Sequence, residues 1–132
     1  MKNEEFTYFL ARLPIGLSFF GHGAVRLPKL EAFSHWMAGL FAKTFLPQSL
    51  VQAFGYVLPI FELITGILIL IGLFTRGGIL LGLILILILI FGSSLIENWE
   101  NVFIQVVYGA YLVILYRYLA YNRASFDYAV RL

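Results

Sequence analysis

Residues 50–76 read LVQAFGYVLPIFELITGILILIGLFTR. This stretch is long enough to cross a bilayer as a helix, because about 20 apolar residues at ~1.5 Å each span the ~30 Å hydrocarbon core. One acid, Glu62, lies near its middle. A carboxylate at that depth costs roughly 2.5–3.5 kcal/mol on insertion scales, so we expect it to face the protein interior and to have a partner. Glu62 is therefore the first candidate functional residue.

The composition of the whole chain indicates an integral membrane protein. Of its 132 residues, 61% are hydrophobic and 12% are charged, and the mean hydropathy is +0.92. Such a chain has too few polar side chains to cover a soluble globule of its size. The absence of cysteine excludes disulfides, thiolate-bound metals and iron–sulfur clusters held by this chain. The net charge of +2, with dispersed basic residues, argues against nucleic acid as a partner.

Four long apolar segments predict an all-α fold, an integral membrane four-helix bundle that forms a single transmembrane domain over residues 1–132. The predicted spans cover about residues 6–27, 50–74, 77–96 and 102–119. Arg12 and Pro14 interrupt the first segment, and no small-residue cleavage motif follows it. We therefore expect a retained first span rather than a cleavable signal peptide.

The segment between the first two spans has a different character. Residues 28–49 mix charged side chains with apolar ones at intervals of three and four residues, which is the spacing of an amphipathic helix. The segment is too polar to cross the bilayer. We expect it to lie in the headgroup plane as an interfacial amphipathic helix, with Trp36 as an anchor.

The first and second predicted spans carry matching faces of small residues. At about 100° per residue, the first face holds Arg12, Gly16, Gly23 and Arg26, and the second holds Gly55, Pro59, Glu62 and Gly66. Small residues let membrane helices approach closely. We therefore expect these two faces to pack together, with Arg12 as the ion-pair partner of Glu62.

Depth along the helices suggests a wider polar cluster. A rise of about 1.5 Å per residue puts Arg12 about 9 Å and Glu62 about 18 Å from the cytoplasmic ends of their spans, and an arginine side chain can cover that difference. By the same count His22 and Gln105 lie at about 22–24 Å. The predicted cluster comprises Arg12, His22, Glu62, Gln105 and Tyr108, and the secondary candidates are Arg26, Tyr56 and Arg76.

Each candidate also has a purely structural interpretation, and no catalytic role is assigned to any of them. Arg12 and Glu62 could form a buried ion pair that only fixes the helix register. His22 and Gln105 could be interhelical hydrogen-bonding residues. His22 and His35 are the only histidines, and one falls in a span while the other falls in the interfacial segment, so we expect no bis-histidine haem. No metal site is expected.

The distribution of basic residues predicts the orientation in the membrane. The side that holds both termini carries six basic residues and the other side carries three, which favours both termini in the cytoplasm. The first group is Lys2, Arg12, Arg76, Arg117, Arg123 and Arg131, and the second is Arg26, Lys29 and Lys43.

Two sequence motifs carry a family resemblance. The first span reads FFGHG over residues 19–23 before Arg26 and Leu27, and the second runs from Glu62 to GLFTR over residues 72–76. Over most of its length the chain resembles the DoxX family of small four-span bacterial membrane proteins. It departs from the family pattern at Arg26, where lysine is common, and at Thr65, where the family often has a second glycine before Gly66.

The resemblance implies a multi-pass protein of the bacterial inner membrane. Members of the family are associated with quinone-linked sulfur oxidation and with redox-defence complexes, and some are called thiosulfate:quinone oxidoreductase subunits. A quinone would then be the expected cofactor. A soluble or membrane-bound redox enzyme would be the expected partner, and a homo-oligomer is compatible with the sequence.

Three functions remain open at this level. The first is a quinone-interacting redox subunit, in which His22 or Tyr108 binds the head group and Glu62 handles protons. The second is a non-catalytic scaffold or accessory subunit. The third is a small-molecule or proton carrier, which Pro14 and Pro59 beside charged residues would favour. Whether the protein is an enzyme stays open, and no motif of a soluble enzyme is present.

Overall fold

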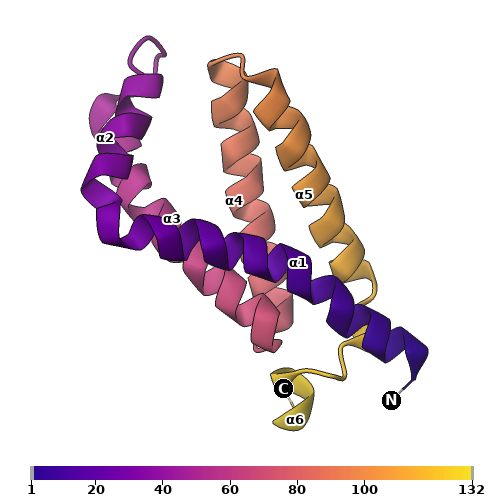
Figure 1. Cartoon of the computed structure of the whole chain (residues 1–132). Coiled ribbons are helices and arrows are strands. Elements are labelled where there is room, and N and C mark those ends of the chain that lie inside the picture. The colour runs from indigo at the N-terminus through magenta and orange to yellow at the C-terminus, as the bar shows by residue number, and fades with distance from the viewer. Residues whose placement is uncertain (1, 132) are drawn as a thin grey trace.

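The computed structural model describes residues 2–131, and all of their regular structure is helical (Figure 1). The all-α prediction is therefore confirmed for this part of the chain. The long helices are α1 (Asn3–Arg26), α2 (Leu30–Leu40), α3 (Gln48–Ile71), α4 (Thr75–Leu95) and α5 (Trp99–Arg117). The shorter elements are η1 (Leu27–Lys29), η2 (Leu119–Tyr121) and α6 (Phe126–Ala129).

Three of these helices, α3, α4 and α5, are long and apolar enough to cross a membrane. Large apolar side chains such as Ile84, Leu87 and Phe103 point outward from them and are more than half exposed. In a bilayer these side chains would meet lipid rather than water. The chain is therefore a multi-pass membrane protein. That α1 forms a fourth span remains a prediction, since this helix also carries four charged side chains, Glu4, Glu5, Arg12 and Arg26.

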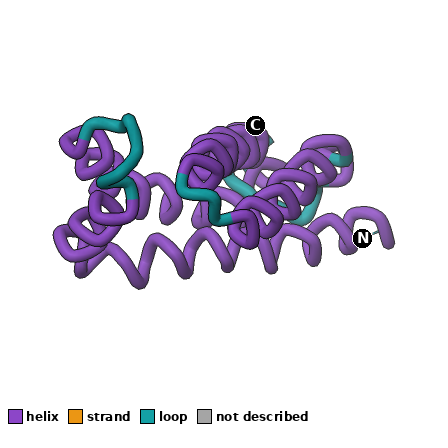
Figure 2. The backbone as a smooth tube through the Cα atoms, turned by 90° about the horizontal axis from the view of Figure 1, so that it is seen from above, coloured by secondary structure: helices purple, strands orange, loops and turns teal. Residues whose placement is uncertain are grey.

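Helix α1 crosses α3 obliquely, and these two helices pack over a larger surface than any other pair in the described chain (Figure 1). Seen from above, α1 runs along one side of the remaining helices (Figure 2). Glycines make this crossing close. A Cβ atom on Gly23 would lie 2.5 Å from the backbone N of Leu63, and one on Gly66 would collide with the backbone of Phe20. The prediction that the two small-residue faces pack together is confirmed.

The remaining helices form two further pairs. Helix α2 runs beside the first half of α3 in the opposite direction, and α4 and α5 form an antiparallel hairpin (Figure 1). One face of α2, including Phe33 and Met37, is buried, and Ser34 Oγ donates to the carbonyl of Gln52 in α3 at 2.7 Å. The amphipathic pattern thus reflects packing on α3, while its position in the headgroup plane remains a prediction.

The turn between α3 and α4 explains why α4 begins two residues earlier than predicted. Gly72 ends α3 in the left-handed region at φ 72°, which is the usual role of glycine after a helix. The carboxylate of Asp127 then accepts hydrogen bonds from the backbone N of Phe74 at 2.5 Å and of Thr75 at 2.8 Å. These donors would otherwise be unpaired at the helix start. The C-terminal segment therefore caps α4.

Candidate functional site

A cavity of about 670 Å³ lies between α1, α2 and α3 on one side and α4 and α5 on the other. Pockets of about 300–1,000 Å³ are typical of small-molecule sites. Its walls are mainly apolar, and the aromatic ones are Phe19, Phe33, Trp36, Phe41, Phe54 and Phe91. The polar side chains that reach it from the helix walls are His22, Arg26, Glu62, Ser93, Gln105 and Tyr108. Four of the five residues in the predicted cluster therefore line one cavity.

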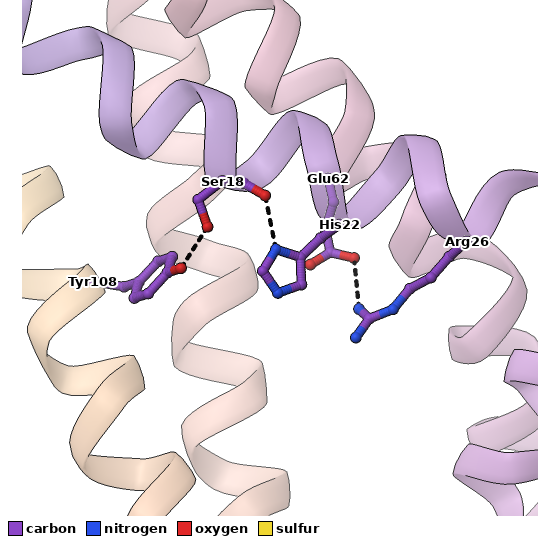
Figure 3. A network of polar contacts seen from close by, with 5 residues as sticks. All are labelled: Ser18, His22, Arg26, Glu62 and Tyr108. Carbon is purple, nitrogen blue, oxygen red and sulfur yellow. Dashed lines mark hydrogen bonds and ion pairs between the residues drawn. The ribbon is translucent and has the colours of Figure 1, made fainter.

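Glu62 is held in this cavity by Arg26 (Figure 3). Arg26 Nη1 donates to Glu62 Oε1 at 3.3 Å, and the Glu62 side chain is only 6% exposed whereas that of Arg26 is 30% exposed. The guanidinium also lies 4.4 Å from the centre of the Phe33 ring, so the cation is stabilised by an aromatic face as well. The expectation that Glu62 has a cationic partner is correct, but the prediction that Arg12 is that partner is wrong.

The register of α1 on α3 explains this correction. Gly23 lies against Pro59 and Leu63, and a Cβ on Gly16 would lie 3.1 Å from the backbone N of Leu70. The helices run in opposite directions, so the residues of α1 beyond Gly23 come level with Glu62. Arg12 lies more than three turns away along α1, next to the end of α3.

Arg12 is instead buried beneath the C-terminal segment, where it is 1% exposed. Its Nη1 donates to Asn122 Oδ1 at 3.0 Å and its Nη2 donates to the carbonyl of Ala124 at 2.7 Å. Asn122 Nδ2 in turn donates to Thr75 Oγ1 at 2.9 Å. We call Arg12, Asn122 and Ala124 the C-terminal clamp, because they tie the end of the chain to α1 and α4. Arg12 lies outside the cavity.

A second group of polar contacts joins α1 to α5 across the cavity wall (Figure 3). The hydroxyls of Ser18 and Tyr108 are hydrogen-bonded to each other. One turn on, His22 Nδ1 lies 2.7 Å from the carbonyl oxygen of Ser18. His22 therefore lies between the Ser18–Tyr108 pair and the Arg26–Glu62 pair. Ser18 was not predicted from the sequence, because a single serine in an apolar helix gives no distinct signal.

Gln105 lies on the α5 side of the same cavity. Its Nε2 donates to Ser93 Oγ of α4 at 3.1 Å, which agrees with an interhelical role. Its Oε1 is buried and has no hydrogen-bond partner among the described residues. A buried carbonyl oxygen without a donor costs free energy, so Gln105 makes only part of its possible hydrogen bonds in this packing.

The other secondary candidates lie apart from the cavity. Tyr56 is exposed on α3 and does not line it. Arg76 Nη1 donates to the hydroxyl of Tyr116 at 3.1 Å and its guanidinium lies 5.3 Å from that ring. Arg26, in contrast, was only a secondary candidate and proves to be the partner of Glu62.

The Arg26–Glu62 pair can be tested by a double-mutant cycle. We expect Glu62→Gln and Arg26→Gln each to lower the free energy of unfolding by on the order of 1–3 kcal/mol, because each leaves a charged group without its hydrogen-bond partner. The double variant should lose clearly less than the sum of the two. Denaturant titrations in detergent measure all four proteins, with Lys43→Gln in the exposed α2–α3 loop as control. Strictly additive losses would contradict the pairing.

Comparison with known proteins adds one positive finding. The family model described as DoxX matches residues 7–94, which is well over half of the chain. This stretch includes the α1–α3 crossing and the Arg26–Glu62 pair. Neither the curated proteins nor the solved structures provide a match.

Proposed function

This chain belongs to the DoxX family. We propose that it binds a quinone head group in the cavity between its helices, as the membrane subunit of a redox complex. The observation that carries this proposal is the composition of the cavity. Within a membrane protein it combines an aromatic wall with an ion pair and a histidine. An amphipathic ring compound from the bilayer suits such a site.

The residues present fit this group. Phe33, Phe54 and Trp36 offer flat apolar surfaces for a ring. Arg26 keeps N–H donors that Glu62 does not use, and His22 keeps a second ring nitrogen, so the oxygens of the ring meet polar atoms in either redox state. A quinone, when bound, carries electrons and protons between membrane partners. Glu62 is placed in the wall to exchange a proton with solvent or ligand, and Arg26 stabilises its carboxylate.

The proposal includes a partner and a topology. The chain has no cysteine to take part in electron transfer, so a separate redox enzyme supplies or receives the electrons. In this arrangement α1 is the fourth span of a bacterial inner-membrane protein, both termini are cytoplasmic and α2 lies at the outer headgroup level. The cavity includes Leu46, Asn98 and Asn101 from the loop end of the molecule, so it would open toward the outer leaflet.

The test is direct binding. We expect organic extraction of the purified protein to release quinone, and added quinone or quinol to raise its thermal unfolding midpoint by several degrees, because a ligand that binds only the folded state stabilises it. Ile104→Trp, which fills the cavity from α5, should abolish the stabilisation. Val106→Trp on the outward face of α5 is the matched control and should retain it. No extractable quinone together with no stabilisation would leave only a scaffold or accessory role.

A further inference from the structure

The cavity is elongated along the helices. On α3 it is lined by one residue per turn at intervals of four, namely Leu50, Phe54, Leu58 and Glu62. At ~1.5 Å per residue, the step of twelve residues from Leu50 to Glu62 covers about 18 Å. A single aromatic ring is much shorter than this distance. A ring bound at one end therefore leaves most of the cavity open to another part of the same ligand.

The charged groups lie at one end of this cavity. Arg26 and Glu62 are the charged side chains that line it in the part of the chain that the structure describes, and His22 lies one turn before Arg26 on α1. Closer to the loops, the polar side chains of Ser93 and Gln105 are hydrogen-bonded to each other at 3.1 Å. The ion pair therefore marks the polar end, and the cavity becomes more apolar away from it.

The polar side chains at the loop end carry no charge. Asn98 Oδ1 accepts a hydrogen bond from the backbone N of Asn101 at 3.2 Å, and the Trp36 ring packs 5.7 Å from that of Phe33. Hydrogen bonds in which one partner is charged are roughly twice as strong as neutral ones. A polar head group therefore gains more at the ion pair than at the loop end.

The cavity also opens sideways through an apolar rim. Four of its lining side chains, one from each of the helices α2 to α5, are exposed at the surface of the molecule as well: Leu40, Leu50, Ile88 and Ile104. The rim lies between α2 and α3 on one side and α4 and α5 on the other (Figure 1). In a bilayer these side chains meet acyl chains. An apolar chain can pass the rim without contact with water.

The two sides of the cavity touch where α2 ends. A Cβ atom on Gly92 of α4 would lie 3.1 Å from Cζ of Phe41, and both residues line the cavity. The aromatic ring therefore packs on the backbone of α4. A larger side chain at position 92 would enter the cavity beside this ring, which gives an experiment a way to narrow the apolar part and leave the ion pair unchanged.

We propose, on the basis of the function proposed above, that the ligand is a single-tailed amphiphile whose head group lies at the Arg26–Glu62 pair and whose tail follows the apolar part of the cavity to the rim. A quinone with an isoprenoid or alkyl tail belongs to this class. The aliphatic and aromatic walls supply dispersion contacts to the tail, each small but many in number. A quinone without a tail leaves these contacts unmade.

The experiment compares decylubiquinone with ubiquinone-0, which has the same head group without the tail, on the full-length protein in detergent. The ratio of their dissociation constants measures the contribution of the tail. We expect Gly92→Leu to lower this ratio by about tenfold, through weaker binding of decylubiquinone, because the leucine displaces the tail. Gly77→Leu on the same helix, where a Cβ meets no atom within 4 Å, is the matched control and should leave the ratio unchanged. Partition of the tail into micelles is common to all variants and cancels in this comparison.

A second pair of variants tests the rim without adding bulk. Ile88→Ser changes an exposed residue that lines the cavity, whereas Ile84→Ser changes an exposed residue one turn earlier that does not line it. We expect Ile88→Ser to lower the ratio by about threefold, since the tail loses apolar contacts there. Ile84→Ser should leave the ratio unchanged. This pair tests the proposal even if Gly92→Leu does not fold.

The direction of the tail is measured by a decylubiquinone analogue with a photoreactive diazirine at the end of its tail. We expect label on residues 46–51 and 88–92, which lie toward the rim and the loops. Label around residues 58–62 would mean that the head group lies at the loop end, and it would overturn the proposed orientation.

The outcomes separate this inference from the function on which it rests. If both quinones bind, and the ratio in Gly92→Leu and Ile88→Ser equals that of the unmodified protein, the path of the tail is wrong and quinone binding stands. If Gly92→Leu weakens ubiquinone-0 as much as decylubiquinone, the head group occupies the outer part of the cavity and the inference also fails. If neither quinone binds the unmodified protein, both the inference and the proposed function fail.

Discussion

Replacing Gly23 with alanine should destabilise the protein by about 2–3 kcal/mol, because its new methyl group has no room in the α1–α3 crossing. The Cβ would lie 2.5 Å from the Pro59 carbonyl oxygen and 2.5 Å from the Leu63 backbone N. These are backbone atoms of a packed helix and cannot rotate away as a flexible side chain can. The two helices would have to separate, which would also disturb the Arg26–Glu62 pair one turn further along. A denaturant titration in detergent measures the loss.

Gly21 provides a matched control in the same helix. A Cβ at this position meets no atom within 4 Å. We expect Gly21→Ala to be neutral or to stabilise the protein by about 0.5–1 kcal/mol, since alanine is the better helix former. If the two substitutions had equal effects, the close packing of α1 on α3 would not be what requires glycine.

Replacing Arg12 with glutamine should lower the free energy of unfolding by about 3 kcal/mol, at least as much as Gly23→Ala, because buried hydrogen bonds are lost. Arg12 is 1% exposed, and its two terminal nitrogens reach separate acceptors, Asn122 Oδ1 and the carbonyl of Ala124. Each hydrogen bond from a charged group contributes about 1.5–3 kcal/mol when its partners are otherwise buried. Glutamine is too short to reach both. Proteolysis after residue 118 should accelerate as well, because the C-terminal clamp holds the segment that follows.

Lysine at the same position distinguishes charge from geometry. Arg12→Lys retains the positive charge but offers one ammonium instead of a planar fork, so we expect it to recover less than half of the lost stability. Arg117→Gln, at an exposed cation that lies over Tyr118, is the control and should cost less than about 1 kcal/mol. Full stability in Arg12→Gln would mean that the clamp does not hold the C-terminal segment.

The sequence contained enough information for the elements and for one interface. Long apolar runs predict the helices, and the structure places their ends within a few residues of the predicted ones. The small-residue faces of Gly16 and Gly23 on α1 and of Gly66 on α3 follow from helical spacing, because in apolar surroundings small residues mark close contacts. Glu62 belongs to one of these faces, whereas His22 was grouped with it from the depth count, and both line one cavity.

Helical spacing could not predict which residues pair with Glu62 and with Arg12. The depth estimate counts residues from assumed span ends and treats the helices as parallel to the membrane normal, whereas α1 crosses α3 obliquely (Figure 1). By that count Arg12 and Glu62 differ in depth by about 9 Å, or six residues. The difference did not exclude the pair, because an arginine side chain is long enough to cover it. Arg26 lies opposite Glu62 because of the crossing. Crossing angles depend on side-chain packing from both helices, which helical periodicity alone does not specify.

The contacts of the C-terminal segment with α1 and α4 could not be predicted from the sequence either. Asn122 and Asp127 belong to a mixed polar stretch that shows no helical period, so no pattern indicates that they contact residues 12 and 75. These contacts join residues 110 and 52 positions apart, so they are a property of the tertiary fold. A buried arginine predicted for a site within the bundle thus serves the end of the chain instead.

The location of the ligand is tested most directly by photo-crosslinking with a quinone that carries an azide on its head group. We expect label on cavity-facing segments, residues 33–40 of α2 and 104–108 of α5, and loss of that label when excess decylubiquinol is present. Label confined to the outward faces of α4 and α5, around Leu87 and Val113, and insensitive to the competitor, would contradict it.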